Sequence, residues 1–540
     1  MRHPLFQLLQ VSRLMIFLLL LGGIGAHAQR PAYGGKLKPE QANMDILHYA
    51  IDVRVDIPNE RIDGNTTIRL ILHQPATDLL FDLMDSFKVE KVWVNGQQAT
   101  GFTHRDHYLR IHSDKPWQSG SCTVKVIYGG RPMIARRPPW DDGFTFTKDS
   151  AGHAWVAVTA EGTGGKIFFP CKDHPSDEPD EGVDLNVTVP RELIVAGPGT
   201  LQAVTRRGSE STFHWTTHYP INNYSIVFNI GDYTVVRRTY TTIEGHKVPM
   251  EFYVLKMHAA DAPHLLEMME RSAKVKEKYF GEYPWIHDKI GLVETPHLGM
   301  EHQTMNAYGN KFRYTQIGGQ DFDWLMNHEF GHEWWGNKVT AGDWADYWIH
   351  EGIGSYGDAL YTRDLEGEAA YEKIFRGYLT RIKNDQPVVL GKDMEEEEAY
   401  HGDIYVKGAF FMHTLRYVLG DSSFFPALKQ LATDTAYTYS HTVNTEQVEK
   451  LFSHAAGKDL SPLFHLSLYT TQKVEFHVQA LDTVRYRIQL TNIDMSLPVD
   501  ITTDAGTSRM MVDKNGIIVS SASLPLIDPK IFYFKKVIYE

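Results

Sequence analysis

The sequence predicts a multidomain α+β protein in which a mainly helical region lies between two regions of β-strand. The apolar residues alternate with period two up to about residue 240, follow a helical period after about 260, and alternate again after about 470. The length of 540 residues suffices for three or four domains. We therefore expect a targeting segment over 1–28 and domains over 29–240, 241–469 and 470–540.

The composition is that of a globular enzyme, with 42% apolar and 22% charged residues. Acidic residues outnumber basic ones by 67 to 54, and the net charge is -13. Nucleic-acid binders normally carry a basic face, so we expect no nucleic-acid partner. The two cysteines, Cys122 and Cys171, exclude a disulfide framework, and their spacing does not decide whether they pair.

The N-terminus predicts export. Arg2 and Arg13 precede an apolar run over Leu14–Ala26, and Ala26-His27-Ala28 has the small residues of a signal-peptidase site. The run is short for a membrane span, so an uncleaved anchor is the less favoured interpretation. We expect cleavage after Ala28, a periplasmic or extracellular location, and no stable membrane span in the mature chain, because no later stretch is apolar enough.

The first region has the pattern of a large antiparallel β domain of sandwich or barrel type. Period-two alternation runs through His48–Val55 and recurs in three further segments, Thr67–Leu72, Thr123–Tyr128 and Asp184–Val189. Turn pairs such as Asn95-Gly96 separate these runs.

The middle region begins with an amphipathic helix, for which Asp261 is the expected N-cap, Pro263 a first-turn residue and Gly281 the end. Glu395–Glu398 is expected to be a solvated acidic run. Further helices are expected over 323–336, 351–364, 367–383, 406–419, 423–433 and 445–456, and strands over 474–478, 484–490 and 517–521.

His328-Glu329-Phe330-Gly331-His332 is the central motif of the middle region. Helical residues at i and i+4 share a face, so both imidazoles can bind one metal ion. Glu329 points slightly aside and is placed to take a proton from metal-activated water. The motif is weak by itself, because a chain this rich in His and acidic residues can contain it by chance.

Glu351 strengthens the metal interpretation, since it lies nineteen residues after His332 at the start of an expected helix. Two histidines and one glutamate form a catalytic zinc site whose fourth position is left for water. We expect one Zn²⁺ per chain, held by His328, His332 and Glu351. Asp346 is a candidate hydrogen-bond acceptor for a ligand histidine, with a capping role as the alternative.

With these motifs the chain resembles the M1 (gluzincin) family of zinc aminopeptidases, which includes aminopeptidase N and leukotriene A4 hydrolase. The resemblance covers about Asp45 to Phe464. Its motifs, in the family's order, are Phe169-Pro170-Cys171-Lys172-Asp173, Leu298-Gly299-Met300-Glu301-His302, the zinc motif with Glu351, and Tyr405-Val406-Lys407-Gly408. The resemblance implies a β saddle, a thermolysin-like catalytic domain and a variable C-terminal region.

The resemblance also implies roles for single residues. Glu329 would be the general base and Tyr405 the hydroxyl donor to the tetrahedral oxyanion, with Tyr400 as a second candidate. Glu301, and Glu161 twelve residues before Asp173, would bind the free α-ammonium of a peptide.

The segment around Glu301 would also bind substrate through its backbone. Gly299 and Met300 would lie on a strand that pairs with the peptide. His302 departs from the family motif. Glu161 has an alternative interpretation as a solvated acid in a glycine-rich loop.

The predicted function is a zinc-dependent aminopeptidase acting on peptides with a free N-terminus. Two alternatives stay open at this stage. One is a related zinc endopeptidase or a bifunctional epoxide hydrolase on the same fold, because the motif around Glu301 is altered. The other is a binding scaffold that has lost catalysis, which the presence of all three metal ligands, Glu329 and Tyr405 disfavours.

Overall fold

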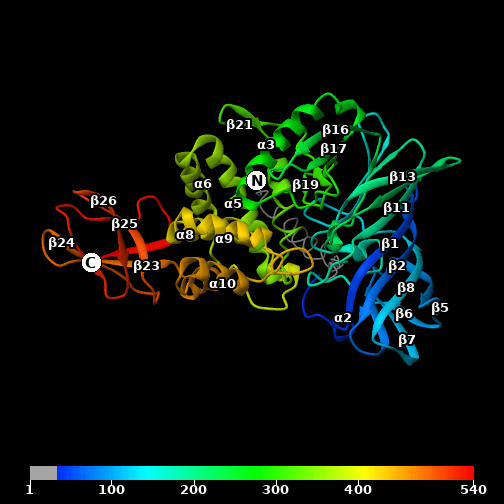
Figure 1. The fold of residues 1–540 in the computed structure, drawn as a ribbon, viewed down its shortest axis with the longest axis horizontal. Coiled ribbons are helices and arrows are strands. Elements are labelled where there is room, and N and C mark those ends of the chain that lie inside the picture. The colour runs from blue at the N-terminus through cyan, green and yellow to red at the C-terminus, as the bar shows by residue number, and fades with distance from the viewer. Residues whose placement is uncertain (1–32) are drawn as a thin grey trace, which may run out of the picture. The chain divides into compact units, whose positions relative to one another are not determined.

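The structure is a computed structural model that describes residues 33–540, so the predicted signal peptide over 1–28 lies outside the described residues. The order of the elements in Figure 1 runs from strands through a helical region to strands again, and the predicted α+β architecture is confirmed.

An eight-stranded sheet forms the main layer of the N-terminal region, in the order β13-β14-β11-β1-β2-β8-β4-β5 (Figure 1). Most neighbours are antiparallel as expected, but β1 and β11 run parallel. The prediction of a purely antiparallel domain is therefore wrong at this pair. The chain leaves the sheet after β8 and builds other strands before it returns, which allows a parallel neighbour. The strands are β1 (Met44–Asp56), β2 (Arg61–Leu72), β4 (Phe87–Val94), β5 (Gln97–Gln98), β8 (Gly120–Gly130), β11 (Val183–Pro190), β13 (Thr200–Arg207) and β14 (Glu210–Thr216).

Two smaller sheets accompany this layer around one apolar core, in which Cys122 and Cys171 are both buried and unpaired. The first sheet contains β3 (Ala76–Asp82), β6 (Gly101–Arg105) and β7 (Tyr108–Trp117). The second contains β9 (Gly143–Lys148), β10 (Ala154–Thr159), β12 (Ile194–Ala196) and β15 (Asn229–Gly231). Short helical elements are α2 (Pro39–Ala42), η1 (Gly165–Ile167) and η2 (Asn223–Ser225).

A five-stranded sheet precedes and flanks the central helices, in the order β16-β17-β18-β20-β19. Its last three strands were not expected as a sheet. They are short and wholly buried, so no polar alternation marks them in the sequence. The strands are β16 (Tyr233–Thr241), β17 (Lys247–Leu255), β18 (Ile290–Glu294), β19 (Gly299–Met300) and β20 (Asn306–Tyr308), followed by the hairpin β21 (Thr315–Ile317) and β22 (Gln320–Phe322).

The helices of the middle region lie near their predicted positions. Gly281 ends α3 with φ 89°, and Asp261 occupies the predicted N-cap position, although its side chain forms no cap hydrogen bond. The acidic run Glu395–Glu398 is largely exposed, as expected. The helices are η3 (Lys256–His258), α3 (Ala262–Phe280), α4 (Trp324–Gly331), η4 (Trp344–Asp346), α5 (Trp348–Glu366), α6 (Glu368–Arg381), α7 (Glu396–Ala399), α8 (Asp403–Leu419), α9 (Asp421–Thr433), α10 (Thr445–Ala456) and α11 (Ser461–Leu468).

The C-terminal region consists of a four-stranded and a three-stranded sheet. Their strands are β23 (Val474–Ala480), β24 (Arg485–Leu490), β27 (Ile517–Ser520) and β29 (Lys535–Tyr539), then β25 (Leu497–Thr503), β26 (Gly506–Val512) and β28 (Leu526–Ile527). Among the described residues, no helix combines the length and the apolar character needed to cross a membrane.

Candidate active site

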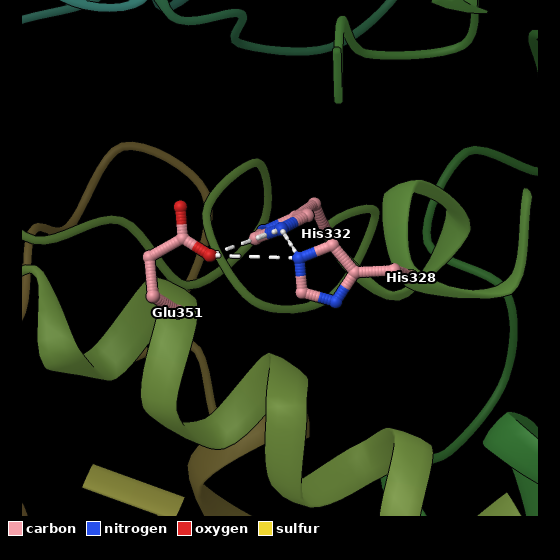
Figure 2. A group of neighbouring side chains, drawn as sticks. All are labelled: His328, His332 and Glu351. Atoms are coloured by element: carbon pink, nitrogen blue, oxygen red, sulfur yellow. Dashed lines mark hydrogen bonds and ion pairs between the residues drawn. The ribbon is translucent and has the colours of Figure 1, made fainter. Parts of the chain in front are cut away.

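Three potential metal donors converge between α4 and α5. His328 lies on α4, His332 directly after its end, and Glu351 in the first turn of α5. Figure 2 shows the two imidazoles and the carboxylate pointing toward one another. The two Nε2 atoms are 3.4 Å apart, and Glu351 Oε2 lies 3.7 Å from that of His328 and 3.5 Å from that of His332.

This geometry fits a tetrahedral zinc ion. Metal bonds of about 2.0–2.1 Å place neighbouring tetrahedral donors about 3.3 Å apart, close to the separations seen here. Glu351 Oε2 is buried and has no hydrogen-bond partner among residues 33–540. A buried carboxylate oxygen without a partner is costly, and a cation at the centre of the three donors would satisfy it.

Both histidines are held by their second ring nitrogen. His328 Nδ1 donates to Asp358 Oδ2 at 2.8 Å, and His332 Nδ1 donates to the carbonyl of Trp335 at 2.8 Å. These bonds leave each Nε2 with its lone pair toward the centre. α4 ends at Gly331 and not at 336 as predicted, and the turn that follows brings the Trp335 carbonyl to the ring of His332.

The acceptor for a ligand histidine is therefore Asp358, and the suggestion of Asp346 is wrong. Asp346 instead accepts hydrogen bonds from the backbone nitrogen of Thr445 at 3.0 Å and from its hydroxyl at 2.6 Å. The sequence could have indicated this acceptor. Asp358 follows Glu351 by seven residues and so lies two turns along the same helix face.

Two tyrosines meet at the other oxygen of Glu351. The hydroxyl of Tyr405 donates to Oε1 at 2.7 Å and that of Tyr400 at 3.1 Å, and the two hydroxyls also contact each other. Burial and nearby carboxylates raise the pKa of both tyrosines well above the usual value, so both hydroxyls keep their protons. The structure thus places both sequence candidates at the metal donors without choosing between them.

Glu329 lies beside the donors and almost buried. Its carboxylate, that of Glu301 and an imidazole nitrogen of His332 offer donor atoms within 4.8 Å of one another. Gly299 allows this approach, since a Cβ at that position would lie 2.4 Å from Glu329 Oε1. Gly299 and Met300 form β19, which is the edge strand of its sheet, so its other side pairs with no further strand of the described chain.

Glu301 follows β19 and is buried. Tyr224 donates its hydroxyl to Glu301 Oε1 at 3.3 Å, and Asn337 donates its amide to the Glu301 carbonyl at 2.8 Å. Burial raises the pKa of the Glu301 carboxyl, and the charge of Glu351 acts in the same direction. Tyr224 lies on η2, remote in the sequence, and no local pattern marks it as a partner.

Glu161 belongs to the N-terminal region and lies beside Glu301 and Glu351. Its carboxylate offers a donor atom within 4.8 Å of those of Glu301 and Glu351, and its Oε1 is buried with no hydrogen-bond partner in the described chain. The backbone nitrogens of Gly165 and Lys166 donate to Asp173 at 3.0 and 3.2 Å and so hold the loop that carries Glu161. Glu161 is half-buried and lies beside the other carboxylates of the site, which favours the site interpretation over the solvated-loop alternative.

The carboxylates of the site carry opposite pKa shifts. Burial opposes ionisation of Glu351, but the His332 and His328 imidazoles reverse this effect and lower the pKa of Glu351 to about 2. Burial raises the pKa of Glu161 and of Glu329 well above the usual value, and the charge of Glu301 adds to this in both. The site therefore joins a metal position, a buried carboxylate placed as a base, and a cluster of carboxylates that favours a cation.

Two domain families match the chain: the "Peptidase M1 N-terminal domain" over residues 46–224 and the "Peptidase family M1 domain" over residues 265–466. Together they cover more than half of the chain. The second match contains the three metal donors, Glu301, Glu329 and Tyr405, and the first contains Glu161.

Several curated proteins and solved structures are similar. Aminopeptidase N of Escherichia coli is 29% identical over 39% of this chain and 26% of its own length. Aminopeptidase N of Caulobacter vibrioides is 24% identical over 58% of this chain and 38% of its own length. The chain thus spans well under half the length of these two relatives. A crystal structure of an M1 zinc metallopeptidase from Deinococcus radiodurans, bound to a Tyr-Ser-Ala substrate, has the same fold with a TM-score of 0.67 at 22% identity, over 82% of this chain and 96% of that one.

Proposed function

The chain belongs to peptidase family M1, and on this basis we propose that it is a zinc-dependent aminopeptidase that hydrolyses the N-terminal peptide bond of peptides. One observation supports this function most strongly. The carboxylates of the buried Glu301 and the half-buried Glu161 lie within reach of the metal donors, and no lysine or arginine of the described chain pairs with them. A substrate ammonium supplies the missing positive charge.

His328, His332 and Glu351 would hold the zinc ion, and one ion per chain fits the three donors. When bound, zinc polarises the scissile carbonyl and activates water for attack. Asp358 and the Trp335 carbonyl keep the two imidazoles in the tautomer that presents Nε2.

Glu329 is the general base. Its carboxylate lies next to the donors and is held clear of bulk water, so it can accept the proton of the attacking water and pass it to the leaving amine. The Tyr405 hydroxyl is the hydrogen-bond donor to the oxygen of the scissile carbonyl, which gains negative charge during the reaction. This hydroxyl now donates to Glu351, and a substrate carbonyl beside the metal would take over that donor.

Glu301 and Glu161 bind the substrate α-ammonium by charge-assisted hydrogen bonds. This contact fixes the N-terminal residue and places the first peptide bond over the metal position. Gly299 and Met300 would align the peptide by backbone pairing along the free edge of β19.

We also propose that the protein acts outside the cytoplasm, in the periplasm or the extracellular space, after cleavage of a signal peptide at Ala28. The support is the sequence of residues 1–28. Cell fractionation with N-terminal sequencing of the purified protein tests this proposal, and a mature chain that begins at Met1 in the cytoplasm would contradict it.

Metal analysis and a substrate panel test the enzymatic proposal. We expect one zinc per chain, hydrolysis of aminoacyl-anilides, and far slower cleavage of a peptide after acetylation of its N-terminus. Cleavage of blocked and free peptides at equal rates would favour the endopeptidase alternative. Absence of stoichiometric zinc would contradict the metal assignment.

A further inference from the structure

A buried lysine lies behind the metal donors and has no part in the mechanism above. Lys276, on α3, is only 2% exposed. Its Nζ donates to Asn327 Oδ1 at 3.0 Å and to the hydroxyl of Ser272 at 3.1 Å. Ser272 and Asn327 are fully buried, and the Ser272 hydroxyl also donates to Asn327 Oδ1, at 2.7 Å. The amide oxygen of Asn327 therefore accepts from two donors.

These two donors decide which way the Asn327 amide faces. With Oδ1 toward Lys276 and Ser272, the amide nitrogen points the other way and donates to Asp358 Oδ1 at 2.6 Å. A flipped amide would set NH₂ against an ammonium and a carbonyl against a carboxylate, and both contacts are repulsive. Lys276 thereby secures a donor for Asp358.

Asp358 connects Asn327 to the metal donor His328. Its Oδ1 is occupied by Asn327, and its Oδ2 accepts from His328 Nδ1 at 2.8 Å. The chain of contacts thus runs from Lys276 through Asn327 and Asp358 to His328. Burial lowers the pKa of Lys276 to about 8, and the charge of Asp358 opposes this, so the two charges act on each other.

Gly331 gives the lysine room to reach this position. A Cβ at Gly331 would lie 3.2 Å from Lys276 Cε, closer than an ordinary contact. Glycine is a poor helix former, yet here it ends the helix that carries His328. The glycine of the metal motif and the buried lysine therefore fit together as a pair.

We propose that Lys276 is a positioning residue of the zinc site, which orients His328 through Asn327 and Asp358. The proposal rests on the proposed zinc site but not on the proposed substrate. A residue on α3, outside the ligand motif, would therefore contribute to the affinity for zinc. Loss of contacts behind a ligand histidine typically costs about 10–100-fold in metal affinity.

The test is the zinc dissociation constant of the full chain, measured by competition with a chelator in the absence of substrate. We expect Lys276→Met to weaken zinc binding by about 10–100-fold. Lys289→Met is the matched control. Lys289 is equally buried, but its Nζ donates to the carbonyls of Gly197 and Gly199, away from the metal donors. Its variant should lose folding stability and keep the wild-type zinc affinity.

A double-mutant cycle tests the route through Asp358. In an Asp358→Ala background, Lys276→Met should weaken zinc binding by less than about two-fold further, because the link to His328 is already broken. If Lys276→Met does not fold, Asn327→Ala breaks the same route while Lys276 is retained, and the same loss is expected.

Three results would overturn the proposal. The first is wild-type zinc affinity in folded Lys276→Met or Asn327→Ala protein. The second is an equal loss with Lys289→Met, which would indicate a general effect of buried charge. The third is an undiminished loss in the Asp358→Ala background. Failure of the wild type to bind zinc would instead contradict the proposed function.

Discussion

The two halves of the candidate site hold their charged groups in opposite ways. In the metal half (His328, His332 and Glu351), each histidine has a protein partner on its second ring nitrogen, and Glu351 has two tyrosine donors. In the carboxylate half (Glu161, Glu301 and Glu329), no lysine or arginine of residues 33–540 forms an ion pair with any member. Each half combines two buried residues with one half-buried residue, His328 or Glu161, so burial alone does not explain the difference.

The difference indicates which cation each half would bind. The metal half is oriented by the protein before any ligand arrives, and its open oxygen and nitrogens converge on one point. The carboxylate half brings three acids close together. Burial is the main cause that raises the pKa of each, and the charges of nearby carboxylates act in the same direction. Such a cluster of carboxylates stabilises a cation that the substrate brings.

The largest effect is expected from breaking the metal half. His332→Ala or Glu351→Gln should abolish stoichiometric zinc and lower kcat/KM by more than about 10³-fold. The reason is that one oxyanion donor alone is worth about 10²–10³-fold, and metal loss also removes water activation. Zinc content and hydrolysis are measured together. A variant that keeps full activity without zinc would contradict the assignment.

Glu329→Gln separates chemistry from metal binding, since Glu329 adjoins the donors without belonging to them. We expect kcat to fall by about 10²–10⁴-fold, as for loss of a general base, while zinc content stays near one per chain. Thermal unfolding of the variant serves as the folding control. A large loss of zinc instead would place Glu329 among the ligands.

Tyr405→Phe should lower kcat by about 10²–10³-fold, which is typical of one oxyanion donor. Tyr400 still donates to Glu351 in this variant, so zinc affinity should change little. Tyr400→Phe is the control, and we expect a smaller loss from it. The opposite order of the two losses would make Tyr400 the catalytic hydroxyl.

The smallest effect is expected from Glu161→Gln, which keeps the shape and one acceptor but removes the charge. Glu301 retains its carboxylate in this variant, so kcat/KM for a free-amine peptide should fall by only about 3–10-fold, mainly through KM. No change at all would remove Glu161 from the substrate site.

The sequence and the structure agree best where a short periodic pattern determines geometry. The i, i+4 spacing of His328, on α4, and His332, directly after the end of α4, was enough to predict two convergent donors. The short buried strands β18 to β20 have no polar alternation, so the sheet behind Glu301 could not be predicted in full. α4 ends at Gly331, before its predicted end, and the turn that follows brings the Trp335 carbonyl to His332 Nδ1, a side-chain contact that local propensity does not specify.

The approach of Glu161 to Glu301 joins two regions of the chain, and only the motif resemblance suggested it. The hydroxyl of Tyr224 on Glu301 had no sequence signal. Contacts between distant segments of this kind depend on how the regions pack against each other, which a periodic pattern does not specify.

The central claim is that the carboxylate half binds the substrate ammonium, and the most direct measurement is a cycle with Glu301→Gln. The cycle compares kcat/KM of wild type and variant on one peptide with a free N-terminus and on its acetylated twin. We predict a loss of about 10–100-fold on the free peptide, and almost no further loss on the blocked one, which already lacks the charge. Equal losses of kcat/KM on both peptides would contradict the claim, because Glu301 would then contribute without binding the substrate ammonium.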